Sequence, residues 1–429
     1  MKKHLTLLLS IMMVATLLSG CGNKATVSND NKGTESKTTL KGTITFANNK
    51  TDINDTKITD LANQFMKLNP DVKVICEGLS DPNAVLKTRA AANELPDITI
   101  VPSSITKADY ENYFLPLDDL GYTKDKIEFY SEGLGTDGKQ YSITNAINLS
   151  GVFVYNKKVL ADAGVTSFPK TWEELWAACE KVKSKGVIPI VTGFKDGWCI
   201  DPWLFAAADS ISGQNYLLKV LQTKSTPFAE GGEMLNTVKA LKTAYSKGYL
   251  EKDLMSSTFD GTKKALASGE AGMELMASWL PSQVVELGAA SSDISMAPVP
   301  GAKGIFKSGD IWWGIAKNTK SPEAAKAFLK FLWDDGKYAN VCGQASSLIS
   351  VKGAVPGLED LKASGATFLT YQEVDPKIAD QLTSVKNKSE IDFVKVLQEY
   401  ILTKGNPDDV LNKANVKWTS AYKAVIGQK

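Results

Sequence analysis

Apolar and polar positions follow two different periods in the segment after Leu40. Residues 42–47 alternate as in a β-strand, and residues 58–68 place apolar side chains every three or four positions, as in a helix. A strand is expected again at 72–76, a helix at 83–93 and a strand at 97–101. This strand–helix–strand–helix–strand order predicts βαβ units and a largely parallel sheet.

The stretch from Asp137 to Leu175 predicts a strand, a helix, a loop and a second helix. After a tight-turn signal at its start, β-branched, aromatic and aliphatic residues recur at Tyr141, Ile143, Ile147 and 152–155. Helical spacing then runs to Gly164, a residue that tolerates the left-handed position after a helix. Thr171 and Glu174 have the spacing of a capping box, which opens the second helix.

The rest of the chain continues to alternate between helical and strand patterns, without a repeat of fixed period. Ser321 and Pro322 predict a helix start with serine as N-cap and proline in the first turn, and Asn406-Pro407 repeats this signal. Further helices are expected at 172–185, 217–223, 233–247 and 263–267, and strands at 187–192, 272–277 and 309–316.

The order of motifs from Asp137 to Leu175 resembles the lobe-crossing segment of family 1 extracellular solute-binding proteins, the sugar-capturing subunits of ABC importers. The shared features are Asp-Gly-Lys, Tyr-Asn-Lys, a helix ending in Ala-Gly, and Pro-Lys-Thr-Trp-Glu-Glu-Leu. The resemblance implies an α/β fold of the type II periplasmic-binding-protein kind, with two lobes, each a mainly parallel sheet flanked by helices, and a ligand cleft between them. It implies a first lobe of 41–147 plus about 314–347 and a second of about 148–313 plus 348–429.

The first twenty residues have the pattern of a signal peptide, with a short basic start and an apolar run from Leu5 to Leu18. Leu18-Ser19-Gly20-Cys21 also resembles a bacterial lipobox, which implies cleavage before Cys21 and lipidation of its thiol; the alternative is a secretory signal with a chance cysteine. The polar residues 21–40 then form a flexible tether. We therefore expect a lipid-anchored protein on the extracellular face of the bacterial cell membrane.

Composition excludes several kinds of chemistry. The single histidine, His4, lies in the signal segment, so the mature chain has no imidazole for a catalytic triad, a zinc site or a general base. Of 49 basic residues, Lys2 and Lys3 fall in the same segment, which leaves 47 against 48 acidic residues. Arg89 is the sole arginine, and this argues against nucleic acid and against an arginine-clamped anion.

Four cysteines follow Cys21 at wide spacing: Cys76, Cys179, Cys199 and Cys342. Extracellular disulfides are one interpretation, but small buried apolar side chains are the favoured one. No Cys-x-x-Cys pair supports a zinc or iron–sulfur site. For nucleotides, neither Gly-x-Gly-x-x-Gly after a strand nor Gly-x-x-x-x-Gly-Lys-Ser/Thr is present. We expect no metal and no cofactor.

Two motifs in the second lobe are candidates for sugar binding. Asp201-Pro202-Trp203 offers a carboxylate for hydroxyl groups and an aromatic face for a pyranose ring, and it is similar to an acidic-Pro-aromatic ligand motif of maltose-binding proteins. The alternative to ligand binding is a structural role for both residues, with Asp201 as a helix cap and Trp203 in the core. Trp279 ends a buried strand and resembles the family tryptophan that stacks on sugar; core filler is its alternative.

The strand expected at 309–316 carries three more candidates, Asp310, Trp312 and Trp313. Adjacent side chains of a strand face opposite ways, so at most one tryptophan meets the ligand. The position resembles the family's second lobe crossing, where Gly-Gly is often found; Asp310 departs from that pattern and is expected to add an acceptor.

Amide and hydroxyl side chains lie where strands of the first lobe end. Asn48 and Asn49 follow the first strand, and Ser103 and Ser104 follow the third. The crossing strand adds Asn145 and Asn148. All six suit a neutral hydroxylated ligand, and plain turn or strand-edge chemistry is the alternative.

The predicted function is capture of a carbohydrate by hinge closure and its delivery to an ABC transporter permease, by a monomer that is not an enzyme. One rival is a surface glycoside hydrolase, which needs two carboxylates about 5 to 10 Å apart. Asp201 and Asp310 are the only pair that could be nominated. A second rival is a peptide-binding lipoprotein.

Overall fold

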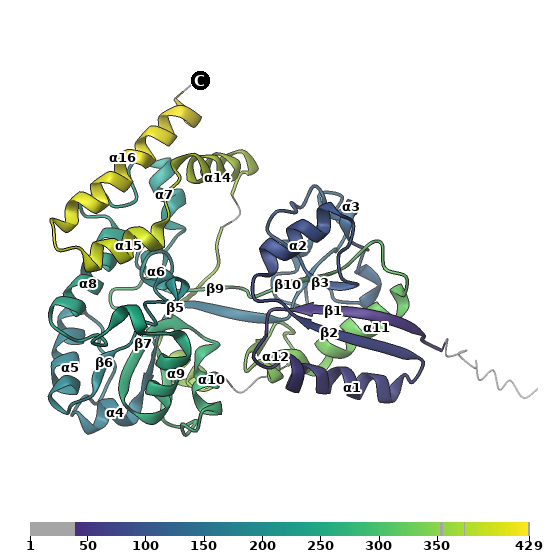
Figure 1. The fold of residues 1–429 in the computed structure, drawn as a ribbon, viewed down its shortest axis with the longest axis horizontal. Coiled ribbons are helices and arrows are strands. Elements are labelled where there is room, and N and C mark those ends of the chain that lie inside the picture. Colours follow the sequence, from purple (N-terminus) through teal and green to yellow (C-terminus); the bar gives the residue numbers. More distant parts are fainter. Residues whose placement is uncertain (1–38, 352–354, 373, 428–429) are drawn as a thin grey trace, which may run out of the picture. The chain divides into compact units, whose positions relative to one another are not determined.

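Two β-sheets, each flanked by helices, organise the chain (Figure 1). The computed structural model describes residues 39–351, 355–372 and 374–427, and the statements below refer to these residues. The strand order is β2-β1-β3-β10-β4 in the first sheet and β12-β9-β5-β7-β6 in the second, where β8 and β11 also pair with β5.

The elements of the first lobe come from two separate parts of the chain. They are β1 (Gly42–Asn48), a π-helical turn (Asn54–Ile58), α1 (Thr59–Leu68), β2 (Val72–Gly78), α2 (Pro82–Ala91), β3 (Ile98–Ile100), α3 (Tyr110–Tyr113), β4 (Ile143–Thr144), β10 (Trp312–Ile315), α11 (Pro322–Trp333) and α12 (Lys337–Val341).

The second lobe begins with the long crossing strand β5. Its elements are β5 (Ala146–Asn156), α4 (Lys157–Asp162), α5 (Trp172–Ser184), β6 (Ile188–Ile190), α6 (Ala206–Ser212), α7 (Tyr216–Gln222), α8 (Glu233–Ser246), α9 (Phe259–Ser268), β7 (Ala271–Ala277), α10 (Leu280–Glu286), β8 (Ile294–Pro298), β9 (Ile305–Gly309), β11 (Ala345–Ser346), α13 (Leu358–Ala363), β12 (Phe368–Leu369), α14 (Pro376–Ser389), α15 (Phe393–Leu402) and α16 (Pro407–Ile426).

The prediction of mainly parallel sheets is correct for β2-β1-β3 and wrong for the second sheet. There β5 is antiparallel to β7, β8, β9 and β11, and only the β6–β7 and β9–β12 pairs are parallel. The reason is the direction of entry: β5 runs away from the first lobe, whereas β6 and β7 run toward it. The sequence pattern reports strands and helices but carries no record of this direction.

Local start and stop signals are largely confirmed. The capping box of Thr171 and Glu174 has both of its hydrogen bonds, and Gly164 has a positive φ of 73°. The predicted helix start is confirmed, since Ser321 occupies the N-cap position of α11 and Pro322 its first turn, although the Ser321 side chain makes no capping hydrogen bond. The single strand expected at 309–316 is also wrong, because β9 and β10 belong to different sheets and the chain crosses between them at Asp310 and Ile311.

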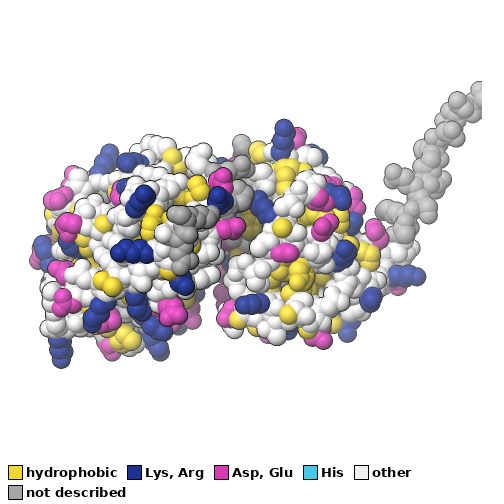
Figure 2. Space-filling model, turned by 90° about the horizontal axis from the view of Figure 1, so that it is seen from above, with side chains coloured by type: hydrophobic (Ala, Val, Ile, Leu, Met, Phe, Trp, Pro, Cys, Tyr) yellow, Lys and Arg dark blue, Asp and Glu magenta, His cyan; other side chains and the backbone are white. Residues whose placement is uncertain are grey.

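Each lobe has its own hydrophobic core. One buried cluster packs on the first sheet, and two clusters pack on the second sheet. On β5, Phe153 belongs to one cluster and its neighbours Val152 and Val154 to the other, as strand alternation requires. The four cysteines of the described chain are unpaired; Cys179, Cys199 and Cys342 are buried, which confirms the favoured interpretation for these three, whereas Cys76 is half-buried. On the face seen in Figure 2, acidic and basic side chains are interspersed.

Candidate functional site

The carboxyl ends of strands from both sheets lie where the chain crosses between the lobes. β10 is antiparallel to β3 with Trp313 opposite Ile100, so the start of β10 lies at the carboxyl ends of the parallel strands. In the second sheet, Ala277 at the end of β7 pairs with Ser150 near the start of β5. Open α/β sheets bind ligands at the carboxyl ends of strands, so the side chains there define the candidate site.

Three segments connect the two sheets, and hydrogen bonds between side chains join all three. Asn145 lies between β4 and β5, Asp310 between β9 and β10, and Gln344 between α12 and β11. Gln344 Nε2 donates to Asp310 Oδ2 at 2.6 Å, and Asn145 Nδ2 donates to Gln344 Oε1 at 3.2 Å. Trp313 Nε1 completes the chain by donating to Asn145 Oδ1 at 3.2 Å. We call these four residues the hinge circuit.

The two adjacent tryptophans of β10 face opposite ways, as alternation predicts. Trp313 is fully buried in the first-lobe core and stacks on Phe46 with ring centroids 5.0 Å apart. Trp312 is half-buried, and its ring lies against Gly309, where an added Cβ would come within 2.9 Å of it. Of the pair, only Trp312 retains surface that a ligand could contact.

Trp203 lies in the core of the second lobe. Its side chain is 1% exposed, meets Phe153 edge to face at 5.8 Å and stacks against Trp172 at 6.3 Å. The alternative of a core residue therefore describes its place in this structure, because neither face of the indole is open. The resemblance of Asp201-Pro202-Trp203 to a ligand motif did not indicate that the Trp203 indole points into the core of the lobe.

Trp279 forms an aromatic cluster with two residues that the sequence did not nominate. Trp198 lies 6.1 Å and Phe259 5.7 Å from its ring, and these two are 4.8 Å apart. Trp198 is 50% exposed and Trp279 is half-buried, so the cluster presents aromatic surface at the end of β7. Ser278 fixes this position, because its Oγ accepts a hydrogen bond from the Leu149 amide of β5 at 3.0 Å.

Asp201 is a half-buried carboxylate that accepts no side-chain hydrogen bond from the described residues. Burial raises its pKa from 3.8 to about 6, while the charge of Lys386 on α14 acts in the opposite direction. A desolvated carboxylate without a partner is costly, and hydroxyl groups of a bound ligand could satisfy it.

The asparagines divide into two groups according to their hydrogen bonds. Asn48 is buried and fully engaged, since it donates to Asn54 and Glu77 and accepts from the Lys50 amide. Asn145 is engaged in the hinge circuit. In contrast, the side-chain oxygens of Asn49 and Asn148 are buried and accept no hydrogen bond within the described chain. Buried acceptors of this kind call for an explanation, and a donor on a ligand is one.

Ser103 and Ser104 are exposed residues beyond β3. The amide of Ser103 donates to Asn83 Oδ1 at 3.0 Å, which fixes the turn and leaves both hydroxyls at the surface. The Ser103 backbone is therefore engaged in a turn, as the alternative interpretation predicts, and the two serine hydroxyls are accessible to a ligand.

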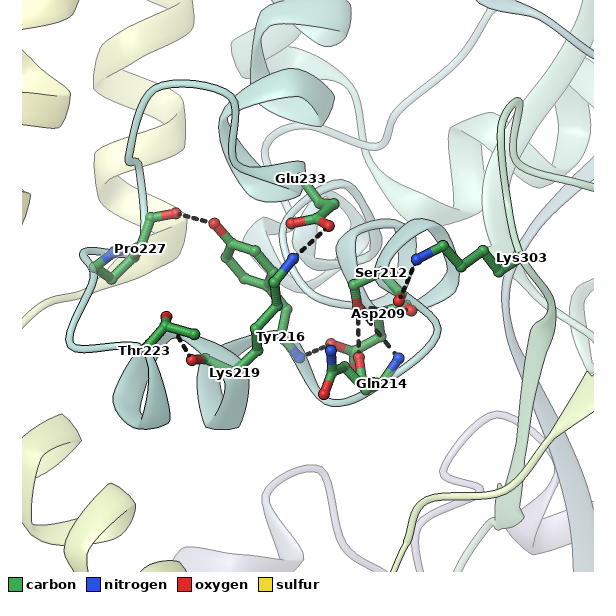
Figure 3. Close-up of polar contacts among 9 residues, drawn as sticks. All are labelled: Asp209, Ser212, Gln214, Tyr216, Lys219, Thr223, Pro227, Glu233 and Lys303. Atoms are coloured by element: carbon green, nitrogen blue, oxygen red, sulfur yellow. Dashed lines mark hydrogen bonds and ion pairs between the residues drawn. The ribbon is translucent and has the colours of Figure 1, made fainter.

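Two further buried carboxylates have structural surroundings. Asp209 near the end of α6 accepts from the Tyr216 amide at 2.7 Å (Figure 3) and from the Tyr371 hydroxyl at 2.7 Å, and burial raises its pKa to about 6. Glu274 on β7 is fully buried and accepts from Thr262, and burial raises its pKa well above the usual value. Within the ranges that the structure covers, no three His, Cys, Asp or Glu side chains gather as metal ligands would.

The comparison with known families settles the class of protein. Residues 60–368 match the model of the bacterial extracellular solute-binding protein family. The chain belongs to this family. Its members are binding components of transport systems and not enzymes, which confirms the expectation of a non-enzymatic protein. Among the described residues, no helix is both long and apolar enough to cross a bilayer.

Individual relatives agree with this assignment. The chain is 26% identical over 417 residues to a multiple sugar-binding protein of Streptococcus mutans, covering 94% of each. It is similar to the ABC-transporter binding protein BlMnBP1 of Bifidobacterium animalis subsp. lactis, solved with mannobiose, at 27% identity and a TM-score of 0.76, with 90% of this chain and 95% of that one covered. RafE, solved with raffinose, has a TM-score of 0.69 at 22% identity, covering 89% and 100%. These matches confirm the two-lobed α/β fold.

Proposed function

We propose that this solute-binding protein captures a neutral carbohydrate between its two lobes and delivers it to the permease of an ABC importer. The observation that carries the proposal is the aromatic cluster of Trp198, Phe259 and Trp279 at the crossing, because aromatic faces pack on the C–H faces of sugar rings. The relatives from S. mutans and B. animalis, whose names state a sugar or whose structure holds one, support the same class of ligand.

Polar contacts to the sugar would come from groups that the protein itself leaves unsatisfied. In the second lobe these are Asp201 and Asn148, and in the first lobe Asn49. Asp310, the hydroxyls of Ser103 and Ser104, and the open edge of Trp312 complete the proposed set. An unpaired buried group costs about 1 to 3 kcal/mol, so a sugar with a misplaced hydroxyl would be rejected.

Binding is coupled to hinge closure in this proposal. A ligand that touches both lobes binds the closed form better than the open form and shifts the population toward it. We take the first lobe as 41–147 plus about 314–347 and the second as about 148–313 plus 348–429. The strand pairings support this division except near its boundaries, where Trp312 and Trp313 pair in the first sheet and β11 pairs in the second.

The attachment to the membrane is part of the same proposal. Residues 1–20 act as the signal peptide, lipidated Cys21 anchors the protein, and 21–40 form a tether that holds a monomer at the extracellular face. All of these but residues 39–40 lie outside the described residues. The family assignment supports an extracellular location.

Calorimetric titration with mannobiose, mannotriose, raffinose, stachyose and chitin oligosaccharides tests the proposal. We expect at least one sugar to bind with micromolar or tighter affinity and to be recovered intact. Release of shorter sugars would favour the hydrolase instead, and binding of a peptide panel without any sugar would favour the peptide-binding lipoprotein.

A further inference from the structure

The three segments that cross between the lobes meet at one buried amide, that of Gln344. This side chain is 3% exposed, as is that of Asn145. Its nitrogen donates to Asp310 of the second crossing, and its oxygen accepts from Asn145 of the first. Glutamine is suited to this position because a single side chain supplies both a donor and an acceptor.

Backbone hydrogen bonds place the three crossings side by side at the same point. The Asp310 amide donates to the Ala146 carbonyl at 2.9 Å, and the Ser347 amide donates to the Asn145 carbonyl at 3.2 Å. A change in the angle between the lobes must turn the backbone at these residues, since they are the connections. The side-chain bonds of Gln344 therefore act where the rotation occurs.

Asp310 links this hinge to the candidate site. One of its carboxylate oxygens accepts from Gln344 at 2.6 Å, while the other accepts no hydrogen bond from the described residues, and the residue is half-buried. A sugar hydroxyl that bonds the second oxygen would contact the hinge circuit directly.

We propose that Gln344 is a positioning residue for ligand binding: through Asp310 and Asn145 it holds the three crossings in the arrangement from which the lobes close on the ligand. The expected effect on affinity rests on the proposed function, because it requires a sugar ligand. The expected effect on the arrangement of the three crossings does not. Without the circuit, the lobes sample a wider range of orientations, and the ligand has to order them, which lowers affinity.

The test uses Gln344→Glu, which keeps the acceptor for Asn145 and replaces the donor with a second carboxylate against Asp310. At pH 8 two charged groups face each other, whereas at pH 5 a shared proton can restore the bond. Relative to the wild type at the same pH, we expect binding about tenfold weaker at pH 8 and within about threefold at pH 5. The probe is the tightest of the sugars titrated above.

The other titratable groups around this point are Lys50 and Asp52 after β1, Cys76 on β2, Tyr338 on α12 and Cys342 directly after α12. Burial raises the pKa of the Tyr338 hydroxyl well above its usual range and that of the Cys342 thiol to about 12. All five groups are present in every variant, so the ratio to the wild type at each pH isolates the effect of the substitution.

Three further variants make the result specific. Adding Asp310→Asn to Gln344→Glu reverses the donor and the acceptor, so this double variant should bind more tightly than Gln344→Glu alone at pH 8 and should show the same ratio to the wild type at both pH values. Gln344→Met removes both bonds without a charge and should weaken binding equally at both. Gln64→Glu, on the exposed face of α1, is the control for added charge and should bind like the wild type.

Hydrogen exchange without ligand gives an independent reading of the hinge. In Gln344→Met, amides 310 and 345–347 should exchange faster than in the wild type, while those of β1 stay unchanged. If the wild type binds no sugar, the proposed function fails but this measurement still tests the hinge. Wild-type affinity of Gln344→Glu at pH 8, absent rescue by the double variant, or unchanged exchange would each overturn the inference.

Discussion

Replacing Trp203 with alanine distinguishes a core residue from a ligand contact. The indole is 1% exposed and packs between Phe153 and Trp172 in the largest core cluster of the second lobe. Trp→Ala in such a core costs about 3 to 5 kcal/mol, because burial is lost and a cavity remains. For a unit of about 150 to 250 residues, each kcal/mol shifts the Tm by about 2 to 4 °C, so a fall of about 6 to 20 °C follows.

The assay combines scanning calorimetry with sugar titration, and Trp279→Ala is the matched control. Trp203→Ala should lower the Tm and keep most of the affinity at a temperature where it is folded. Trp279→Ala should do the reverse, because its half-exposed ring belongs to the surface cluster. If Trp203→Ala abolished binding while its Tm stayed within 2 °C of the wild type, the argument from burial would be refuted.

Three other predictions follow, two from the candidate site and one from the burial of the cysteines. Since burial raises the pKa of Asp201 to about 6, its folded form holds a proton that the unfolded chain releases near pH 4, and stability falls as pH rises from about 4 to about 6. Asp201→Asn should therefore stabilise the protein at pH 7 by at most about 3 kcal/mol, seen as a higher Tm, and should leave the Tm unchanged at pH 4. An equal rise in Tm at both pH values would contradict the argument that burial raises the pKa of Asp201. Trp198→Ala, at a 50% exposed position, should weaken sugar binding measured by calorimetry while the Tm stays unchanged, and wild-type affinity would remove it from the site. A thiol reagent added to a chain starting at Lys41 should label Cys76 slowly and the three buried cysteines only after unfolding, and rapid labelling of all four would contradict their burial.

The fold was predictable because its elements carry local signals. The capping box at Thr171, the left-handed Gly164 and the N-cap at Asn406 mark boundaries that the structure has. The hydrophobic pattern does not show which strands pair: within 309–316 it predicts one strand, whereas Gly309 ends a strand of one sheet and Trp312 begins a strand of the other. Only the resemblance to the family's second lobe crossing indicated a change of lobe here. That break is a long-range property of the chain.

The candidate site was predictable in residue type and not in side-chain direction. Alternation required Trp312 and Trp313 to differ, but only packing against Phe46 identifies Trp313 as the buried one. Asn48 and Asn49 are adjacent residues of the same type, yet the Asn48 side chain is hydrogen-bonded to its neighbours, whereas the side-chain oxygen of Asn49 accepts no hydrogen bond within the described chain.

Gln344 shows most clearly which residues cannot be predicted from the sequence. It lies outside any motif, and its importance comes from Asn145 and Asp310, which are far away in the chain. A signal did exist for Trp198, which lies three residues before Asp201 of the nominated motif, but tryptophans beside turns are too common to single out one.

The order of strands in each sheet has a consequence for how the protein is made. β10, which lies between β3 and β4, is synthesised after the whole of the second-lobe sheet up to β9, and β11 completes the pairing of β5 later still. Neither sheet is complete on a ribosome that has not passed Ile315, and such long-range pairing makes folding slow. A chain interrupted before that residue therefore has an incomplete sheet in both lobes.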